Sequence, residues 1–173
     1  VFEFIRDAVN NFKIKRKINL YQSIIKKDKM EWVVQKVSEL GVLKVVPIIS
    51  DRSEKKDINM DRLNKIAIEA SEQCGRQDII EIVEPVKLRD AFTNKNLNIL
   101  ADISGDNILD FFNKNKDSKA LEEINVFIGP EGGWTDDEII LAKKNKTQII
   151  SLNNYILRSE TASVSIVAII SNL

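Results

Sequence analysis

The chain has 173 residues, 43% of them hydrophobic, which is enough for one substantial core but not for two of equal size. Its single cysteine, Cys74, excludes an internal disulfide, and the absence of histidine excludes the usual imidazole-containing zinc, haem and catalytic-triad sites. The first 17 residues are too charged for a signal peptide and too few for a membrane span. We therefore expect a cytoplasmic protein that holds no metal.

The formal net charge of zero hides an asymmetry along the chain. Residues 1–65 hold 15 Lys and Arg against 9 Asp and Glu, whereas the remaining 108 residues hold 11 against 17. A basic part beside an acidic part suggests that one surface meets a polyanion. Lysine-rich faces that are simply solvated would give the same composition, so charge alone does not identify nucleic acid.

Hydrophobic periodicity predicts that helices and strands alternate along the chain. Helices are expected at 28–40, 61–74, 88–92, 107–113, 136–145 and 159–172, and strands at 42–49, 79–83, 98–103, 125–128 and 148–152. Asp28 with Glu31 resembles a capping box, and Gly41 and Gly75 should end the first two helices. Pro47 should weaken the far end of the first strand. This alternation is typical of an α/β domain whose mostly parallel sheet has helices on both faces.

The last predicted helix is unusually apolar. Its residues 162–170 leave almost no polar face, so we expect it to be buried nearly all round, inside the fold or partly against a second subunit. It has about half the length that a bilayer-spanning helix needs, so it is too short to be a membrane anchor.

The segment 126–138, VFIGPEGGWTDDE, carries the clearest signal for a binding site. An apolar strand runs into three glycines and a proline at 129–133, and Thr135 with Glu138 forms a capping box for the next helix. Loops at the carboxyl ends of strands bind ligands in open α/β sheets. Neither phosphate-loop spacing is present, and the acidic residues of this segment would repel a pyrophosphate. The segment is either a site for a ligand with adenine and a cationic centre, or only a tight turn before a capped helix.

The segment 152–162, LNNYILRSETA, joins the last strand to the apolar helix. Ser159 is the expected cap, and Glu160 lies in the first turn, where the helix dipole favours an acid. Arg158 contributes little to the helix at this position. It either meets a partner outside the fold or pairs with Glu160 or Glu131.

A third segment, 69–76, reads EASEQCGR. Glu69, Gln73 and Arg76 lie three to four residues apart and share one side of the predicted helix. By pattern alone, this side is a solvated face.

The segments 29–42 (KMEWVVQKVSELGV), 69–76, IGPEGGWTDDE and LNNYILRSETA resemble the RsmE family of the SPOUT superfamily in order and separation. The resemblance covers roughly residues 25–173. It implies a SPOUT-type sheet with a deep trefoil knot near the carboxyl terminus, an exception to the usual unknotted topology. It also implies binding of S-adenosyl-L-methionine, a homodimer, and an amino-terminal PUA-like β-barrel that binds RNA. Residues 1–24 would be the remnant of that barrel, and 25–173 the methyltransferase domain.

Residue roles follow from the resemblance by motif. Arg158, Glu131 and Glu160 would be catalytic, and Glu69, Gln73 and Arg76 would contact RNA. Cofactor binding would fall to Ile128, Gly129, Pro130, Gly132, Gly133, Leu152, Tyr155, Ile156 and Leu157. The family pattern L-G-x-R-I-L-R has Gly and Arg where this chain has Asn153 and Tyr155. Because Asn tolerates positive φ, we expect the turn to survive, whereas one RNA contact is in doubt.

The implied reaction is methylation of N3 of a uridine in 16S ribosomal RNA of the small ribosomal subunit. N3 carries a proton, so the reaction needs a general base or a cation that stabilises negative charge on the uracil oxygens. Arg158 is the candidate cation, and Glu131 and Glu160 are the candidate bases. Two alternatives stay open: a SPOUT methyltransferase for another RNA position, such as a transfer RNA 2′-hydroxyl, and a non-catalytic ribosome-assembly protein that binds RNA.

Overall fold

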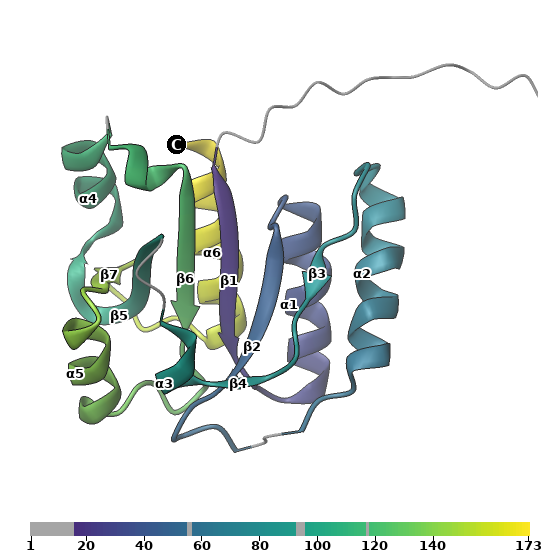
Figure 1. The fold of residues 1–173 in the computed structure, drawn as a ribbon, viewed down its shortest axis with the longest axis horizontal. Helices are drawn as coiled ribbons and strands as arrows, with labels where there is room; N and C mark the ends of the chain where they lie inside the picture. Colours follow the sequence, from purple (N-terminus) through teal and green to yellow (C-terminus); the bar gives the residue numbers. More distant parts are fainter. Residues whose placement is uncertain (1–15, 55–56, 93–95, 117) are drawn as a thin grey trace, which may run out of the picture.

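The computed structural model describes residues 16–54, 57–92, 96–116 and 118–173, and it contains one parallel sheet in the order β3-β2-β1-β6-β5-β7, with β4 also pairing with β2 (Figure 1). Every strand pair of the sheet is parallel. The strands are β1 (Lys17–Ser23), β2 (Lys44–Ile49), β3 (Glu81–Ile82), β4 (Val86–Lys87), β5 (Leu97–Asn107), β6 (Glu123–Ile128) and β7 (Gln148–Ser151). The helices are α1 (Lys27–Glu39), α2 (Met60–Cys74), α3 (Leu88–Ala91), α4 (Ile108–Asn115), α5 (Asp136–Lys144) and α6 (Ser159–Asn172), with a short 3-10 helix at Lys119–Leu121.

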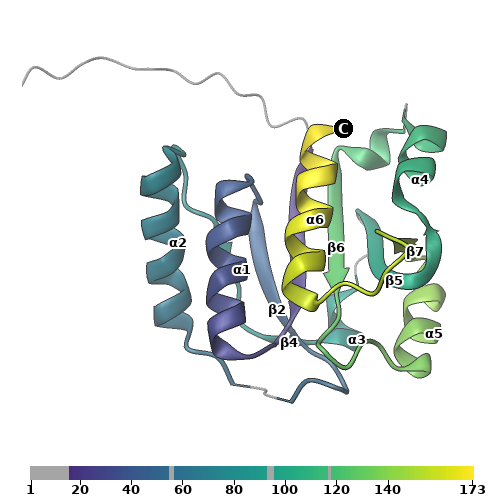
Figure 2. The same ribbon diagram turned by 180° about the vertical axis from the view of Figure 1, so that it is seen from behind.

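Helices pack on both faces of the sheet, as predicted. Figure 2 shows α2, α1 and α6 side by side in front of the strands. Their apolar side chains share a core with alternate strand residues such as Leu20 and Val126. The intervening residues Tyr21 and Phe127 point into a second core, to which α3 and α5 contribute. Both faces of the central strands are therefore buried, which explains their nearly continuous apolar sequences.

The domain boundary predicted after residue 24 is wrong, because β1 lies in the middle of the sheet. It pairs with β2 on one side and with β6 on the other. Its sequence KINLYQS does not look like a buried strand, because Asn19, Gln22 and Ser23 are polar. Each of these three residues is nevertheless at most 1% exposed. Side-chain hydrogen bonds make the burial of Asn19 and Gln22 affordable. The rest of the predicted barrel remnant, residues 1–15, lies outside the described residues.

Two other local predictions are also wrong. The N-cap of α1 is Lys26, without a side-chain cap, and Glu31 contacts Lys27 and Arg62 instead of closing a capping box. Pro47 does not weaken β2. It faces the gap between the short strands β3 and β4, which pair with β2 on either side of it. The missing N–H of proline is therefore tolerated there.

Strand β5 holds β7 at two separate places. Ile150 of β7 is the partner of both Ala101 and Asp106, so β5 pairs with β7 before and after the stretch at 102–105. Gly105 ends this stretch against the β7 backbone. A Cβ atom at Gly105 would lie 2.4 Å from the carbonyl carbon of Ile149 and 2.4 Å from the amide nitrogen of Ile150. Only glycine fits this approach without moving the backbone.

Replacing Gly105 by alanine should therefore destabilise the fold. Overpacking against backbone costs about 3 kcal/mol, at the upper end of the range for small-to-large substitutions. Urea unfolding should show a lower midpoint for Gly105→Ala with an unchanged slope. The neighbouring exposed position Asp106 provides the control, because Asp106→Ala should change the free energy of unfolding by no more than about 0.5 kcal/mol. Equal midpoints for Gly105→Ala and the parent would contradict the close packing.

Candidate functional site

A cavity of about 520 Å³ lies at the carboxyl ends of β6 and β7 and beside the middle of β5. Its volume falls within the range of small-molecule sites. Three segments supply most of the wall, namely residues 101–103, 128–134 and 151–159 without Asn154, and Arg52 and Ala162 complete it. This is the edge of the sheet where open α/β proteins bind ligands.

The cavity brings together the two segments that the sequence singled out. All nine residues predicted to bind a cofactor line it, as do Glu131 and Arg158. Glu160 does not line the cavity and lies behind Ser159 in the first turn of α6. The roles assigned to these residues stay predictions, but their positions permit them to act on one ligand.

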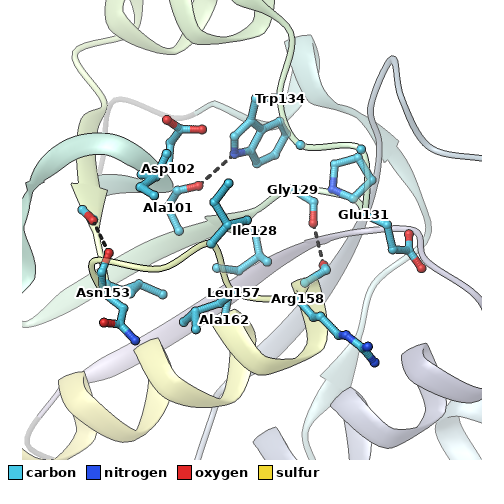
Figure 3. A pocket seen from close by; sticks show the side chains of 18 of the residues that line it. Ala101, Asp102, Ile128, Gly129, Glu131, Trp134, Asn153, Leu157, Arg158 and Ala162 are labelled. Carbon is cyan, nitrogen blue, oxygen red and sulfur yellow. Dashed lines mark hydrogen bonds between the residues drawn. The ribbon is translucent and has the colours of Figure 1, made fainter.

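The glycine-rich loop turns sharply where β6 ends. The amide of Gly133 donates to the carbonyl of Pro130 at 3.0 Å, and Gly133 has φ +68°, a left-handed conformation that favours glycine. Trp134 packs against Gly129, where a Cβ atom would lie 3.1 Å from the indole. The indole Nε1 of Trp134 also donates to the carbonyl of Ala101 at 3.0 Å, as Figure 3 shows. The loop is thus tied to the middle of β5.

The capping box predicted for the following helix is confirmed. The hydroxyl of Thr135 accepts from the amide of Glu138, and the Glu138 carboxylate accepts from the amide of Thr135. The other oxygen of the same carboxylate accepts from the amide of Asp51 at 2.9 Å. Glu138 is only 5% exposed. Its buried carboxylate is stabilised because backbone amides from two loops donate to it.

Ser159 does not cap α6. The N-cap is Arg158, which makes no side-chain cap, and the Ser159 hydroxyl donates to the carbonyl of Gly129 at 2.5 Å (Figure 3). Ser159 in turn accepts from Nε2 of the buried Gln22 of β1 at 3.0 Å, and Ser163 donates to the other end of the same Gln22 amide. These bonds fix the start of α6 to the end of β6 and to the central strand.

The positive φ expected at Asn153 is not observed. Among the described residues other than glycine, only Lys146 has a positive φ, so Asn153 does not replace glycine in that role. Its side-chain oxygen accepts from the amide of Asn154 at 2.7 Å, and its carbonyl accepts from the hydroxyl of Ser151 at 3.0 Å. Next to this turn, Tyr155 is 78% exposed at the cavity rim.

The charged side chains near the cavity are not paired as the sequence suggested. Within the described part of the chain, Arg158 makes neither an ion pair nor a side-chain hydrogen bond, although Figure 3 shows it on the same side of the cavity as Glu131. Nζ of Lys29, at the start of α1, lies 3.5 Å from Glu131 and 3.4 Å from Glu160. Lys29 thus takes the partners considered for Arg158.

The third segment lies away from the cavity. Glu69 and Gln73 are exposed on α2, which Figure 1 shows at the opposite side of the sheet from β7. Arg76 folds back and donates to the carbonyls of Ser38 at 2.9 Å and Val42 at 3.1 Å. It also pairs with Asp78, and hydrogen bonding from Arg76 lowers the pKa of that carboxyl. An RNA contact by these three residues stays a prediction, but Arg76 has a structural role.

Sequence reasoning missed several residues of the wall, above all Arg52, Asp102 and Trp134. Arg52 follows the end of β2, so a search of strand ends would have found it. Asp102 lies within β5 and would not have been found in this way. In the described ranges, no group of three or more acidic or cysteine side chains could hold a metal ion. No helix among those residues is long and apolar enough to cross a membrane.

A parallel α/β sheet with a ligand-sized cavity at its carboxyl edge, bounded by a glycine-rich loop, defines a ligand-binding domain of the nucleotide-cofactor class. Residues 13–171 match the model of the RNA methyltransferase domain. The chain belongs to the RsmE family of RNA methyltransferase domains. The family resemblance seen in the sequence motifs is thereby confirmed.

Its relatives include two called ribosomal RNA small subunit methyltransferase E. That of Aquifex aeolicus is 36% identical over 161 residues, covering 90% of this chain and 68% of the relative, and that of Rickettsia conorii is 32% identical over 160 residues, covering 89% and 64%. The crystal structure of the Neisseria gonorrhoeae enzyme of that name, bound to S-adenosyl methionine, matches with a TM-score of 0.79 and 30% identity, covering 91% of this chain and 66% of that one. The chain thus spans about two thirds of the length of these relatives.

The bond from Ser159 to Gly129 should contribute measurably to stability. Replacing Ser159 by alanine leaves the Gly129 carbonyl without this donor and removes one acceptor from buried Gln22, which should cost about 1–3 kcal/mol. Thr161→Ala, at an exposed position in the same helix turn, is the matched control. Differential scanning calorimetry should show a lower melting temperature only for the Ser159 variant. If both variants melt with the parent, the network does not hold α6 in place.

Proposed function

We propose that the chain is the catalytic domain of an S-adenosylmethionine-dependent RNA methyltransferase that methylates N3 of a uridine in 16S ribosomal RNA of the small subunit. The observation that carries this proposal is the cavity, in which the two family motifs meet. The names of the relatives supply the substrate class, and the Neisseria gonorrhoeae structure supplies the cofactor. The ribose-methylating and non-catalytic alternatives have no observation in their favour.

The residues of the cavity fit the cofactor. Ile128, Leu152 and Leu157 offer apolar surface for an adenine ring, and the glycine-rich loop lets backbone approach it without intervening side chains. Glu131 and Asp102 line the same cavity, and their negative charge suits a ligand with a sulfonium and an ammonium group. When bound, the cofactor supplies a methyl group on an electrophilic sulfonium.

Arg158 and an acidic side chain would then act on the uracil. The N3 proton must pass to a base before or as N3 attacks the methyl group, and its loss places negative charge on N3 and the uracil oxygens. That charge is neutralised when N3 takes the methyl group. Arg158 has no partner in the described fold and can donate to these oxygens. Of the two candidate bases, Glu131 is favoured over Glu160 because only Glu131 lines the cavity. Lys29 contacts both carboxylates and would orient them.

Three further features that the resemblance implies belong to the proposal. The double pairing of β7 with β5 and the close contact at Gly105 support a carboxyl-terminal trefoil knot. Exposed apolar side chains at the cavity rim, namely Tyr155, Ile156 and Ile103, support burial against a second copy in a homodimer. RNA binding by an amino-terminal PUA-like barrel is compatible with the greater length of the relatives, with its boundary before β1.

Cofactor binding can be tested by thermal shift. At one hundred times its dissociation constant, S-adenosylmethionine or S-adenosylhomocysteine should add about 2.7 kcal/mol of stability. For a chain of this size, that corresponds to a rise of about 5–10 °C in the melting temperature. ATP and NAD serve as controls and should give no shift, because no phosphate loop is present. A folded protein whose melting temperature ignores both S-adenosyl compounds would rule the proposal out.

Arg158→Ala should lower kcat by roughly 10², the scale expected when a charge-stabilising donor is removed, with a smaller effect on cofactor affinity. Arg158→Lys should recover little, because an ammonium does not reproduce the planar fork of guanidinium. Single-turnover methyl transfer to small ribosomal subunits that lack the modification is the measurement. Arg89→Ala is the control, since Arg89 is exposed on α3 and outside the cavity wall.

If Arg158 is the catalytic cation, Arg158→Ala must methylate more slowly than the parent. Methylation by Arg158→Ala at the parental rate would mean that charge on the uracil is stabilised elsewhere. The Arg89 variant should stay within about twofold of the parent, because a distant exposed substitution changes little.

A further inference from the structure

The loop that follows β2 is fastened to the glycine-rich loop, although β1 separates β2 from β6 in the sheet. A single nitrogen of Arg52, Nη1, donates to the carbonyl of Gly132 at 3.0 Å and to that of Trp134 at 3.1 Å. These carbonyls flank Gly133, the residue with a left-handed conformation. Arg52 therefore bridges the part of the loop that has the greatest conformational freedom.

A second set of hydrogen bonds joins the same two loops through Asp51, the residue before Arg52. The amide of Asp51 donates to the Glu138 carboxylate at 2.9 Å, and the hydroxyl of Thr135 donates to the Asp51 carboxylate at 3.3 Å. The β2 loop itself is closed by a bond of 2.8 Å between the hydroxyls of Ser50 and Ser53. Arg52 thus projects from a loop that is itself fixed.

The stem of Arg52 also packs closely over Gly132. A Cβ atom at Gly132 would lie 3.2 Å from Cβ and 3.5 Å from Cδ of Arg52, and Gly132 does not have a positive φ. A side chain at residue 132 would therefore press against the Arg52 stem, which would have to shift by a few tenths of an ångström. Arg52 lines the cavity as well, so the bridge lies at the wall that a ligand would touch.

We propose that Arg52 is a positioning residue that holds the glycine-rich loop in its ligand-binding shape through the carbonyls of Gly132 and Trp134. This inference rests on the proposed function, because it concerns the cofactor cavity. Without the bridge, the loop would populate other shapes, and apparent affinity falls in proportion to the fraction of competent molecules. Arg52 acts on the loop, so its effect should not depend on whether the ligand carries a carboxylate.

The test compares two ligands by titration calorimetry. S-adenosylhomocysteine has an amino-acid carboxylate, whereas 5′-methylthioadenosine has the same adenosine thioether without it. Arg52→Met keeps an apolar stem over Gly132 and removes the guanidinium. Loss of two hydrogen bonds from a charged donor should weaken both ligands by the same factor, roughly 10- to 100-fold.

Arg52→Lys should recover most of the affinity, because one nitrogen makes both bonds and an ammonium can take its place. The rescue is the opposite of that expected at Arg158. Arg62→Ala is the matched control, since Arg62 is exposed on α2 and outside the cavity wall. If Arg52→Met does not fold, Arg52→Gln, which retains an amide on a shorter stem, tests the same point with the same expected loss for both ligands.

The outcomes separate the inference from the proposed function. A parent protein that binds neither ligand would overturn the proposed function. A parent that binds both, with an Arg52→Met variant of equal affinity, would overturn only the role of Arg52. A loss confined to S-adenosylhomocysteine would also overturn it, because Arg52 would then contact the carboxylate of the ligand directly. Equal losses with recovery in Arg52→Lys are the expected result.

Discussion

The hydrogen bond from Ser159 to the carbonyl of Gly129 joins the two segments that supply most of the cavity wall. It links the end of β6 to the start of α6, segments about thirty residues apart. The side-chain amide of Gln22, which is buried in β1, donates a hydrogen bond to the same serine hydroxyl. Parallel strands bring their carboxyl ends to one edge of the sheet. A single hydrogen bond at this edge can therefore join two segments that are distant in the sequence.

Buried polar groups recur through the centre of this sheet, and hydrogen bonds satisfy most of them. Nδ2 of Asn19 donates to the side chain of Asn125, and Nδ2 of Asn125 donates to that of Asn98, across β1, β6 and β5. Such a ladder fixes the register of three neighbouring strands, because a slip by one residue would leave buried amides unpaired. The polar side chains that made β1 look unlike core in the sequence therefore help to fix its register.

The three cations nearest the site differ in what surrounds them, and this separates their roles. Arg52 is bound to two backbone carbonyls, Lys29 lies between two carboxylates, and Arg158 has no partner in the described residues. A cation whose hydrogen bonds are satisfied shapes the protein, whereas one without partners remains available to a substrate. The same argument assigns Arg76 to the fold, because its guanidinium is bound to two carbonyls and Asp78.

The sequence by itself determined the alternation of helices and strands, the capping box at Thr135 and Glu138, and the two segments that line the cavity, because periodicity, caps and turns are encoded within a few residues. It could not place β1, whose polar residues find their partners only across the sheet. The partners of Lys29 and Arg52 lie about eighty or more residues away. Only the strand order decides which distant loops become neighbours. The tertiary structure was therefore needed to show that Lys29 contacts the two acids, that Arg52 donates to two carbonyls of the glycine-rich loop, and that Arg158 has no side-chain partner among the described residues.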